Sequence, residues 1–207
     1  MIESLSLRSN FKTLENVTYL NQASLGLISE TTSSAMHEFL DNIGKHGNVN
    51  MSDQDEVNYF DDLRNTASIL FGCSPKNLGI LPSASDLLNQ IPFLLSPKAG
   101  SRIILVSNDF PALYRPWQAY SKIHEIKLEF LKEIPNIDLN LTLTATLGHD
   151  VSAVVISYVQ YSTGSIIDIK SLYKITKKLG IKLIIDVTQA AGAIPINVKN
   201  FKCDALI

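Results

Sequence analysis

A carboxylate at the end of an apolar run is the residue in this sequence best placed to do chemistry. Leu183, Ile184 and Ile185 form the run, Asp186 follows at once, and Gln189 comes shortly after it. Such a run is typical of a strand buried on both faces of a parallel sheet, and ligands bind beyond the carboxyl ends of these strands. A buried charge costs free energy unless it meets a partner. Asp186 therefore indicates either a donor within the protein or a bound cation-like group.

Small and hydroxyl-bearing residues open a predicted helix after an earlier predicted strand, residues 78–81. They are Ser83, Ala84 and Ser85, and the acidic residue Asp86 follows them. Backbone N–H groups at a helix start, with hydroxyls beside them, can hold a phosphate. Ser83 with Asp86 is also the pattern of an ordinary capping box, and the acidic residue disfavours phosphate. Both interpretations stay open on these residues alone.

Aromatic and amide side chains follow two further predicted strands. Phe110 comes shortly after the strand predicted over 102–106, where it could stack on a flat ring or pack in the core. After the strand predicted over 153–159, polar side chains precede Gly164, and they could contact a ligand or only form a turn. These residues are Gln160, Tyr161, Ser162 and Thr163.

The four strand ends together have a chemical logic that no single one has. A phosphate anchor, a stacking aromatic ring, hydrogen-bond donors and a carboxylate are what pyridoxal 5′-phosphate (PLP) requires. A carboxylate such as Asp186 keeps the pyridine nitrogen protonated, so that the ring can accept electrons from a substrate carbanion. Gln189 is placed to donate to the phenolic oxygen of the ring. The residues therefore predict a PLP site at one edge of the sheet.

The elements that must position these residues alternate between strand and helix. We expect an α/β fold in which helices cover residues 29–43, 55–71 and 169–179, with loops over 44–54 and 107–117. Asp168 is placed to cap the last of these helices and Gly180 to end it. With its flanking strands this helix forms a βαβ unit, which implies parallel neighbours and a right-handed crossover. The predicted strands are 78–81, 102–106, 126–131 (near an edge), 153–159, 183–185 and 204–207.

Composition bounds the class of protein. The chain has 207 residues, 45% of them hydrophobic, which is enough for one sizeable core with an appendage. Eighteen Lys and Arg residues against twenty Asp and Glu residues give a formal charge of −2, so no nucleic-acid or membrane partner is expected. The start of the chain lacks the apolar segment of a signal peptide, and no run is long enough to span a membrane. We expect a cytoplasmic protein.

Cysteine and histidine spacing indicates no metal site. Cys73 and Cys203 match no CxxC pattern and are expected to be buried thiols in a reducing compartment. The four histidines are scattered without metal-ligand spacing. No GxGxxG motif follows a predicted strand, which argues against a dinucleotide-binding oxidoreductase.

Several motifs, in this order, resemble the class V aminotransferase family. They are YLNQASLG from Tyr19, LPSASDLLN, NDFPALYRPW, SYVQYSTGSIIDI and DVTQAAG. That family consists of PLP-dependent enzymes of fold type I and includes cysteine desulfurases, kynureninases and isopenicillin N epimerase-like proteins. The resemblance implies the three-layer α/β large domain of fold type I, with a mostly parallel sheet, and PLP as the cofactor.

The resemblance also implies roles for individual residues. Ala84 and Ser85 match the phosphate contacts, and Phe110 stands where desulfurase-type members have a ring-stacking histidine. Phe110 therefore argues against a desulfurase, because that histidine is thought to move protons. The other matches are Gln160 beside the phenolic side of the cofactor, Asp186 at the pyridine nitrogen, Gln189 at the phenolic oxygen, and Asn21 and Ala23 near the substrate.

The family further implies a Schiff-base lysine shortly after the strand predicted over 204–207. Neither Lys182 nor Lys199 matches its position, so we expect no catalytic lysine within these residues. The implied organisation is an N-terminal arm and first helix over residues 1–45 and a partial PLP-binding domain over 46–207, without the small C-terminal domain. Such a fragment is expected to be inactive, and to be poorly stable or to associate.

Two hypotheses from different classes follow. The first is the N-terminal part of a PLP-dependent class V enzyme that acts on an amino-acid-like substrate and is a homodimer at full length. The second is a non-catalytic binding or assembly module that keeps the fold and pairs with a full-length homologue. Trapping of bound cofactor by borohydride separates them, because only the complete enzyme links PLP covalently.

Overall fold

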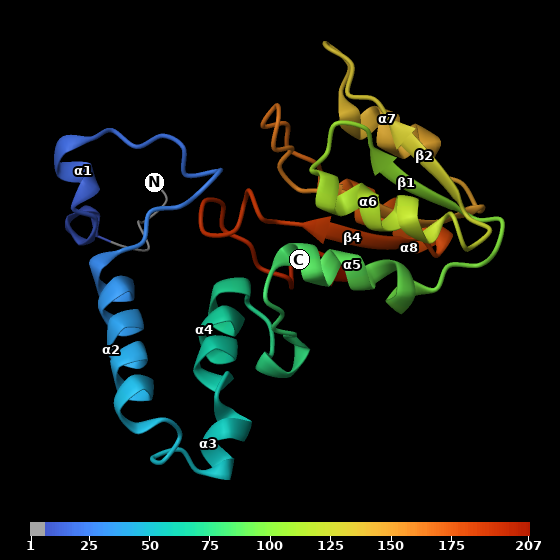
Figure 1. Ribbon diagram of the computed structural model, residues 1–207. Coiled ribbons are helices and arrows are strands. Elements are labelled where there is room, and N and C mark those ends of the chain that lie inside the picture. The colour runs from blue at the N-terminus through green and yellow to red at the C-terminus, as the bar shows by residue number, and fades with distance from the viewer. Residues whose placement is uncertain (1–6) are drawn as a thin grey trace. The chain divides into compact units, whose positions relative to one another are not determined.

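The computed structural model describes residues 7–207, which fall into two compact units (Figure 1). The first unit extends to Thr66, and the second runs from Ala67 to Ile207. Residues 1–6 of the predicted N-terminal arm lie outside the described residues. The functional division between residues 45 and 46 stays a prediction.

The first unit is built from helices. Ser29 caps α2 by accepting a hydrogen bond from the Thr32 N–H group, which confirms the helix predicted to start there. α2 continues to His46, so the loop predicted over 44–54 is shorter than expected. The single helix predicted over 55–71 is wrong: it is two helices, because acidic residues favour a new helix start at Asp61. The helices are η1 (Arg8–Asn10), α1 (Thr13–Asn16), α2 (Glu30–His46), α3 (Asp53–Asn58) and α4 (Asp61–Phe71), the last of which continues into the second unit.

The second unit contains a five-stranded sheet in the order β2-β1-β3-β4-β5, with every neighbouring pair parallel. Apart from residues 78–81, each segment predicted to be a strand becomes one within two residues of the expected start. The edge position predicted for residues 126–131 is also confirmed. The strands are β1 (Arg102–Val106), β2 (Lys127–Leu131), β3 (Val151–Ser157), β4 (Lys182–Asp186) and β5 (Ala205–Leu206).

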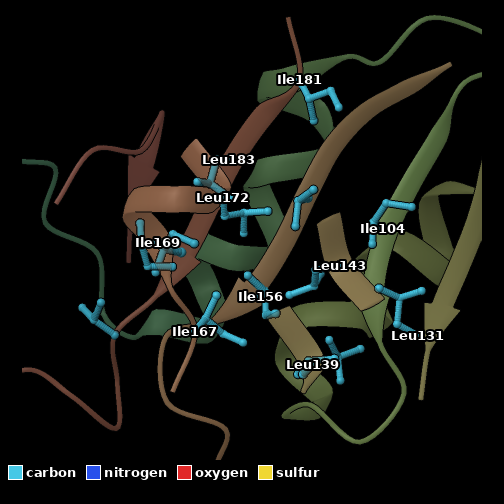
Figure 2. Packing of buried hydrophobic residues seen from close by; sticks show 14 of the residues in the cluster. Ile104, Leu131, Leu139, Leu143, Ile156, Ile167, Ile169, Leu172, Ile181 and Leu183 are labelled. Atoms are coloured by element: carbon cyan, nitrogen blue, oxygen red, sulfur yellow. The ribbon is translucent and has the colours of Figure 1, made fainter. Parts of the chain in front are cut away.

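Helices cover both faces of this sheet, as the three-layer prediction requires. α5 (Ala84–Leu95) and α6 (Pro111–Tyr120) pack with Ile103, Leu105 and Ile184, which point to one face. α7 (Leu139–Thr146) and α8 (Ile169–Leu179) pack on the opposite face (Figure 2). Alternate residues of each strand therefore contribute to two separate hydrophobic clusters, as the pleat of a strand requires.

The βαβ unit β3-α8-β4 forms as predicted. Asp168 accepts a hydrogen bond from the Ser171 N–H group at 3.1 Å, and this capping satisfies a donor that has no partner within the helix. Gly180 ends α8 in the left-handed conformation, with φ of 75°, which glycine adopts without strain.

Two predictions for local structure are wrong. Residues 78–81 form no strand, because no strand of the described chain lies beside them to complete a hydrogen-bond ladder. The loop predicted over 107–117 is largely α6, in which Pro111 occupies a first-turn position that needs no N–H donor. Leu113, Trp117 and Tyr120 are buried at helical spacing, a signal that the prolines of this segment obscured.

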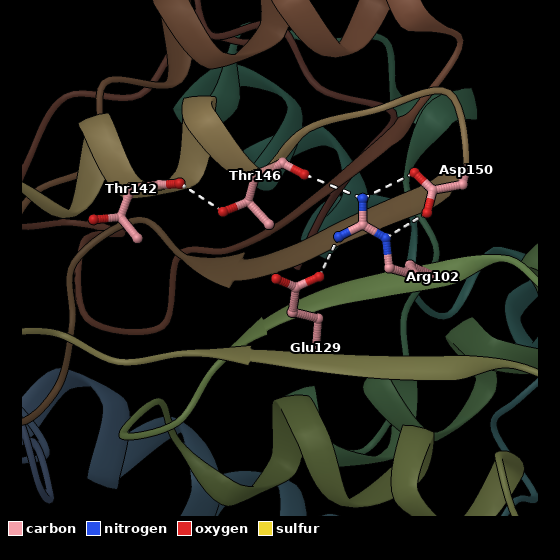
Figure 3. A network of polar contacts seen from close by, with 5 residues as sticks. All are labelled: Arg102, Glu129, Thr142, Thr146 and Asp150. Atoms are coloured by element: carbon pink, nitrogen blue, oxygen red, sulfur yellow. Dashed lines mark hydrogen bonds and ion pairs between the residues drawn. The ribbon is translucent and has the colours of Figure 1, made fainter.

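An ion-pair network joins the amino ends of β1 and β3 to β2 (Figure 3). The Arg102 guanidinium donates two hydrogen bonds to Asp150, at 2.6 and 2.8 Å, and another to the carboxylate of Glu129. A further hydrogen bond runs from Arg102 to the carbonyl oxygen of Thr146. The hydrogen bond from Arg102 is the main cause of a lowered pKa at Asp150.

The Asp150→Asn variant tests the contribution of this network to stability. Because the pKa of Asp150 is lower in the folded state, the stabilisation is present above the ordinary value of 3.8 and is lost as the pH falls through the folded value. Urea denaturation should show a less stable variant at pH 7 and a difference that shrinks below pH 3.8. Glu125→Gln, at an exposed carboxylate, should show no such difference. A stability difference that is independent of pH would contradict the prediction.

Candidate functional site

The order of the strands creates a topological switch point at the carboxyl edge of the sheet. β1 is followed by β2 on one side, whereas β3, β4 and β5 extend the sheet on the other. The helices that follow β1 and β3, α6 and α8, lie on opposite faces. The segments leaving these neighbouring strands therefore diverge, which is the arrangement in which α/β sheets bind ligands.

Asp109 lies at this switch point, between the carboxyl ends of β1 and β3. Its carboxylate accepts hydrogen bonds from the N–H group of Ser157 at 2.8 Å and from the Ser157 hydroxyl at 2.6 Å. The N–H group of Phe110 and the side chain of Gln160 also donate to it. Asp109 is only 3% exposed. The sequence analysis missed this residue, although a carboxylate directly before Phe110 and shortly after an apolar run was an available signal.

Gln160 is buried within the same network. Its Nε2 atom donates to Asp109 Oδ2 and to the carbonyl oxygen of Ser157, both at 3.2 Å. Its Oε1 atom is buried and has no hydrogen-bond partner among the described residues. Because a buried acceptor without a donor costs free energy, this oxygen is a candidate contact for a ligand group.

The segment after Gln160 is held from the neighbouring loop. The Gln160 N–H group donates to the Ser165 carbonyl oxygen, and the Gly164 N–H group donates back to the Gln160 carbonyl oxygen. The carboxylate of Glu133, shortly after β2, accepts hydrogen bonds from the hydroxyls of Thr163 and Ser165. These contacts fix the turn that follows Gln160. They confirm that this segment forms a turn, but they do not test whether its residues contact a ligand.

Asp186 ends β4 beside the end of β3, where it is paired in register with Ser157. It is 5% exposed and forms no ion pair with any residue between 7 and 207. Burial raises its pKa, hydrogen bonds from the N–H group and hydroxyl of Thr188 oppose this, and the charge of Asp109 adds to the increase. The site thus holds a buried carboxylate that lacks a cation in the described chain.

The aromatic residue of the site is accessible. Phe110 is 47% exposed at the start of α6, and its ring meets that of Tyr161 edge to face, with 5.5 Å between the ring centres. The core interpretation of Phe110 is therefore not what the structure shows. Half of the side chain remains free to contact a ligand.

The start of α5 supplies N–H groups that the helix itself does not use. Ser83 caps α5 by accepting a hydrogen bond from the Asp86 N–H group at 3.1 Å, and its hydroxyl donates to the Asp86 carboxylate at 2.7 Å. Capping is therefore present, but it leaves the first-turn N–H groups of Ala84 and Ser85 without intrahelical acceptors. α5 packs in the same cluster as Ile207, which directly follows β5.

The remaining predicted residues are distributed between the units. Gln189 is half-buried in the turn after β4. Asn21 and Ala23 are exposed residues of the first unit, within or next to a turn in which Asn21 accepts hydrogen bonds from the Ser24 and Leu25 N–H groups. The contacts in the second unit thus bring together Phe110, Gln160 and Asp186, with Asp109 and Ser157 linking them.

The donor set fits PLP. A protonated pyridine nitrogen is a cationic donor of the kind that the buried carboxylate of Asp186 lacks. The first-turn N–H groups of α5 suit a phosphate, and the exposed face of Phe110 suits an aromatic ring. The orphaned Gln160 Oε1 atom offers a further acceptor.

Other kinds of site receive no support from the described residues. No group of three or more candidate ligands there could hold a metal ion. No helix in residues 7–207 combines the length and the apolar character that crossing a membrane requires. Cys73 and Cys203 are free and only partly buried, less than predicted, and burial raises the pKa of Cys203 to about 11.

Comparisons with known proteins agree on one family. The profile of the family described as aminotransferase class-V matches residues 18–207. The chain is 31% identical over 202 residues to an uncharacterized aminotransferase, YcbU, of Bacillus subtilis (strain 168), a match that covers 96% of this chain and 52% of that protein. It is 22% identical over 204 residues to a probable cysteine desulfurase of Pyrococcus abyssi, covering 97% and 51% of the two chains.

Solved structures share the fold. A C-DES mutant with glycine covalently linked to its PLP cofactor superposes with a TM-score of 0.84 at 19% identity, covering 96% of this chain and 54% of that chain. The apo cysteine desulfurase from Thermococcus onnurineus NA1 gives a TM-score of 0.81 at 21% identity, covering 96% and 51%. At these identities the likeness establishes the fold alone. The chain spans about half the length of the proteins it matches.

The Asp186→Asn variant tests the cost of burying this carboxylate. Because burial raises the pKa of Asp186, its ionisation destabilises the cofactor-free protein above that pKa, and the penalty disappears as the pH falls below the ordinary value of 3.8. Without cofactor, the variant should be more stable than the wild type at pH 7 by about 1 kcal/mol in urea denaturation, with the gain vanishing in acid.

Asp204→Asn is a matched control for this measurement. Asp204 accepts hydrogen bonds from the side chain of Lys182 at 2.9 Å and from the Leu183 N–H group at 3.0 Å, so its carboxylate is already partnered. The control variant should lose stability at pH 7. A loss of stability in Asp186→Asn as well would show that the Asp186 carboxylate is satisfied without a ligand.

Proposed function

Because this chain belongs to the class V aminotransferase family, we propose that the full-length protein is a PLP-dependent enzyme that acts on an amino-acid-like substrate. The family match confirms the resemblance predicted from the motifs, and the solved structures confirm the fold. The observation that carries the proposal is the buried carboxylate of Asp186, which has no cationic partner among residues 7–207 and ends a strand at the edge where such sheets bind ligands.

Each proposed contact combines a match to the family motifs with the position of the residue in the fold. Asp186 binds the ring nitrogen and keeps its proton in place, since a buried carboxylate beside a cation favours the charged pair. The first-turn N–H groups of Ala84 and Ser85 bind the phosphate, and Phe110 packs against the ring face. Gln189 donates a hydrogen bond to the phenolic oxygen. When bound, PLP supplies an electron-accepting ring that weakens bonds at the α-carbon of an amino acid.

Phe110 also narrows the proposed reaction. A phenyl ring has no titratable group, so it can orient the cofactor but cannot carry a proton at this position. We therefore favour a reaction in which proton transfer at the ring face is not required of this residue, in contrast to desulfuration. Asn21 and Ala23 are proposed to lie near the substrate, and the full-length protein is proposed to be a homodimer.

PLP binding to the full-length protein tests this function. We expect saturable binding, measured by equilibrium dialysis, and a 10- to 100-fold weaker affinity in Asp186→Asn, the range that a lost hydrogen bond between charged groups explains. Glu125→Gln should bind PLP as the wild type does. Absence of PLP binding by the wild type would refute the proposal. A PLP affinity of Asp186→Asn equal to that of the wild type would show that Asp186 does not bind the cofactor.

A further inference from the structure

The carboxylate of Asp109 is a buried charged group to which the roles proposed above assign nothing. It is 3% exposed and takes part in no ion pair within the described residues. Its hydrogen bonds join two segments that are distant in sequence, the start of α6 and the end of β3 with the residues that follow it. Burying a carboxylate costs free energy, so a buried carboxylate at this edge of the sheet calls for a functional or structural reason.

The contacts of Asp109 determine which way the Gln160 amide faces. Gln160 Nε2 lies 3.2 Å from Asp109 Oδ2 and 3.2 Å from the Ser157 carbonyl oxygen, and both of these atoms can only accept. An amide oxygen in the same place would meet two acceptors and no donor. The amide therefore has one favourable orientation, in which Oε1 is directed away from both acceptors.

The Oε1 atom left by this orientation has no partner among the residues that the structure describes, although it is buried. A side chain held by two hydrogen bonds cannot rotate to relieve that deficit without losing them. The unmet acceptor is thus a direct consequence of the Asp109 contact. It lies on the side chain that the sequence analysis places beside the cofactor.

We propose that Asp109 is a positioning residue that fixes the Gln160 amide, so that Gln160 offers an acceptor oxygen and not an N–H group to the bound cofactor. The inference rests on the proposed function, since it takes PLP to bind at this edge. The group that meets Gln160 is then a hydrogen-bond donor, an O–H or N–H group of the cofactor or of the substrate amine. Gln160 and Gln189 consequently have opposite polarity, one accepting and the other donating.

The first arm of the test measures PLP affinity in the full-length protein. Asp109→Asn replaces one carboxylate oxygen with an NH2 donor, so that the Gln160 amide can flip and accept a hydrogen bond from it. Gln160→Met removes the amide group but keeps a side chain of similar volume. Each should weaken PLP binding about tenfold, the effect of one lost hydrogen bond. The double variant should bind no more weakly than the worse single variant, because Asp109 acts through Gln160.

Ser157→Ala is the matched control. It removes a hydroxyl donor from Asp109 but leaves both acceptors of the Gln160 amide in place. A purely structural role for Asp109 predicts that the control and Asp109→Asn affect PLP affinity alike. Unchanged affinity in Asp109→Asn, or losses that add in the double variant, would overturn the inference. If Asp109→Asn does not fold, equal PLP affinities of the Gln160→Met and Ser157→Ala variants would also overturn the inference.

The second arm needs no cofactor. Nuclear magnetic resonance of the cofactor-free protein should show slowly exchanging Gln160 side-chain N–H protons in the wild type and in Ser157→Ala, and fast exchange in Asp109→Asn. Fast exchange in the wild type would overturn the inference even if PLP binds. If the wild type fails to bind PLP, the proposed function is refuted, and this arm still decides whether Asp109 holds the amide.

Discussion

The free-energy cost of burying a carboxylate is the constraint on which the carboxyl edge of this sheet depends. Asp109 and Asp186 are both almost fully buried, and no described residue forms an ion pair with either. Asp109 is surrounded by donors from Ser157, Gln160 and its neighbour Phe110. Asp186 accepts hydrogen bonds from the N–H group and hydroxyl of Thr188, yet burial still raises its pKa. One carboxylate therefore suits an internal structural role, and the other suits a charged ligand.

The end of β3 connects these two carboxylates. Ser157 donates its N–H group and hydroxyl to Asp109, and its register partner on β4 is Asp186. The next residue, Tyr158, donates its N–H group to the carbonyl oxygen of Asp186. A short stretch of one strand thus sets the spacing between the group that orients Gln160 and the group proposed to hold the ring nitrogen. This arrangement explains how Asp109, in one of the family motifs, can contact Gln160 in another.

Sequence patterns predicted the parts of this fold that depend on local composition. Apolar runs such as 102–106 became strands, and Asp168 and Gly180 bounded α8 as expected. The prediction of a strand over residues 78–81 was wrong because a strand needs a neighbouring strand to pair with, and a local sequence pattern does not show whether one is present. α6 was missed because Pro111 and Pro116 resemble loop residues, although a first-turn proline suits a helix. Asp109 was missed because its partners on β3 and after it, Ser157 and Gln160, lie 48 and 51 residues away along the chain. The residue roles stay predictions, since only binding and kinetic measurements test them.

The switch point also has a consequence for how the sheet forms. Among the strand pairs, β1 with β3 joins the residues most distant along the chain, and its register is interrupted between Arg102 and Ile103. Loop-closure entropy is therefore greatest for this pair, and non-local pairing delays folding. We expect the β1–β3 seam to close after the more local β3-α8-β4 unit has formed. A molecule bound across that seam would preferentially stabilise its closed form and so resist local opening there.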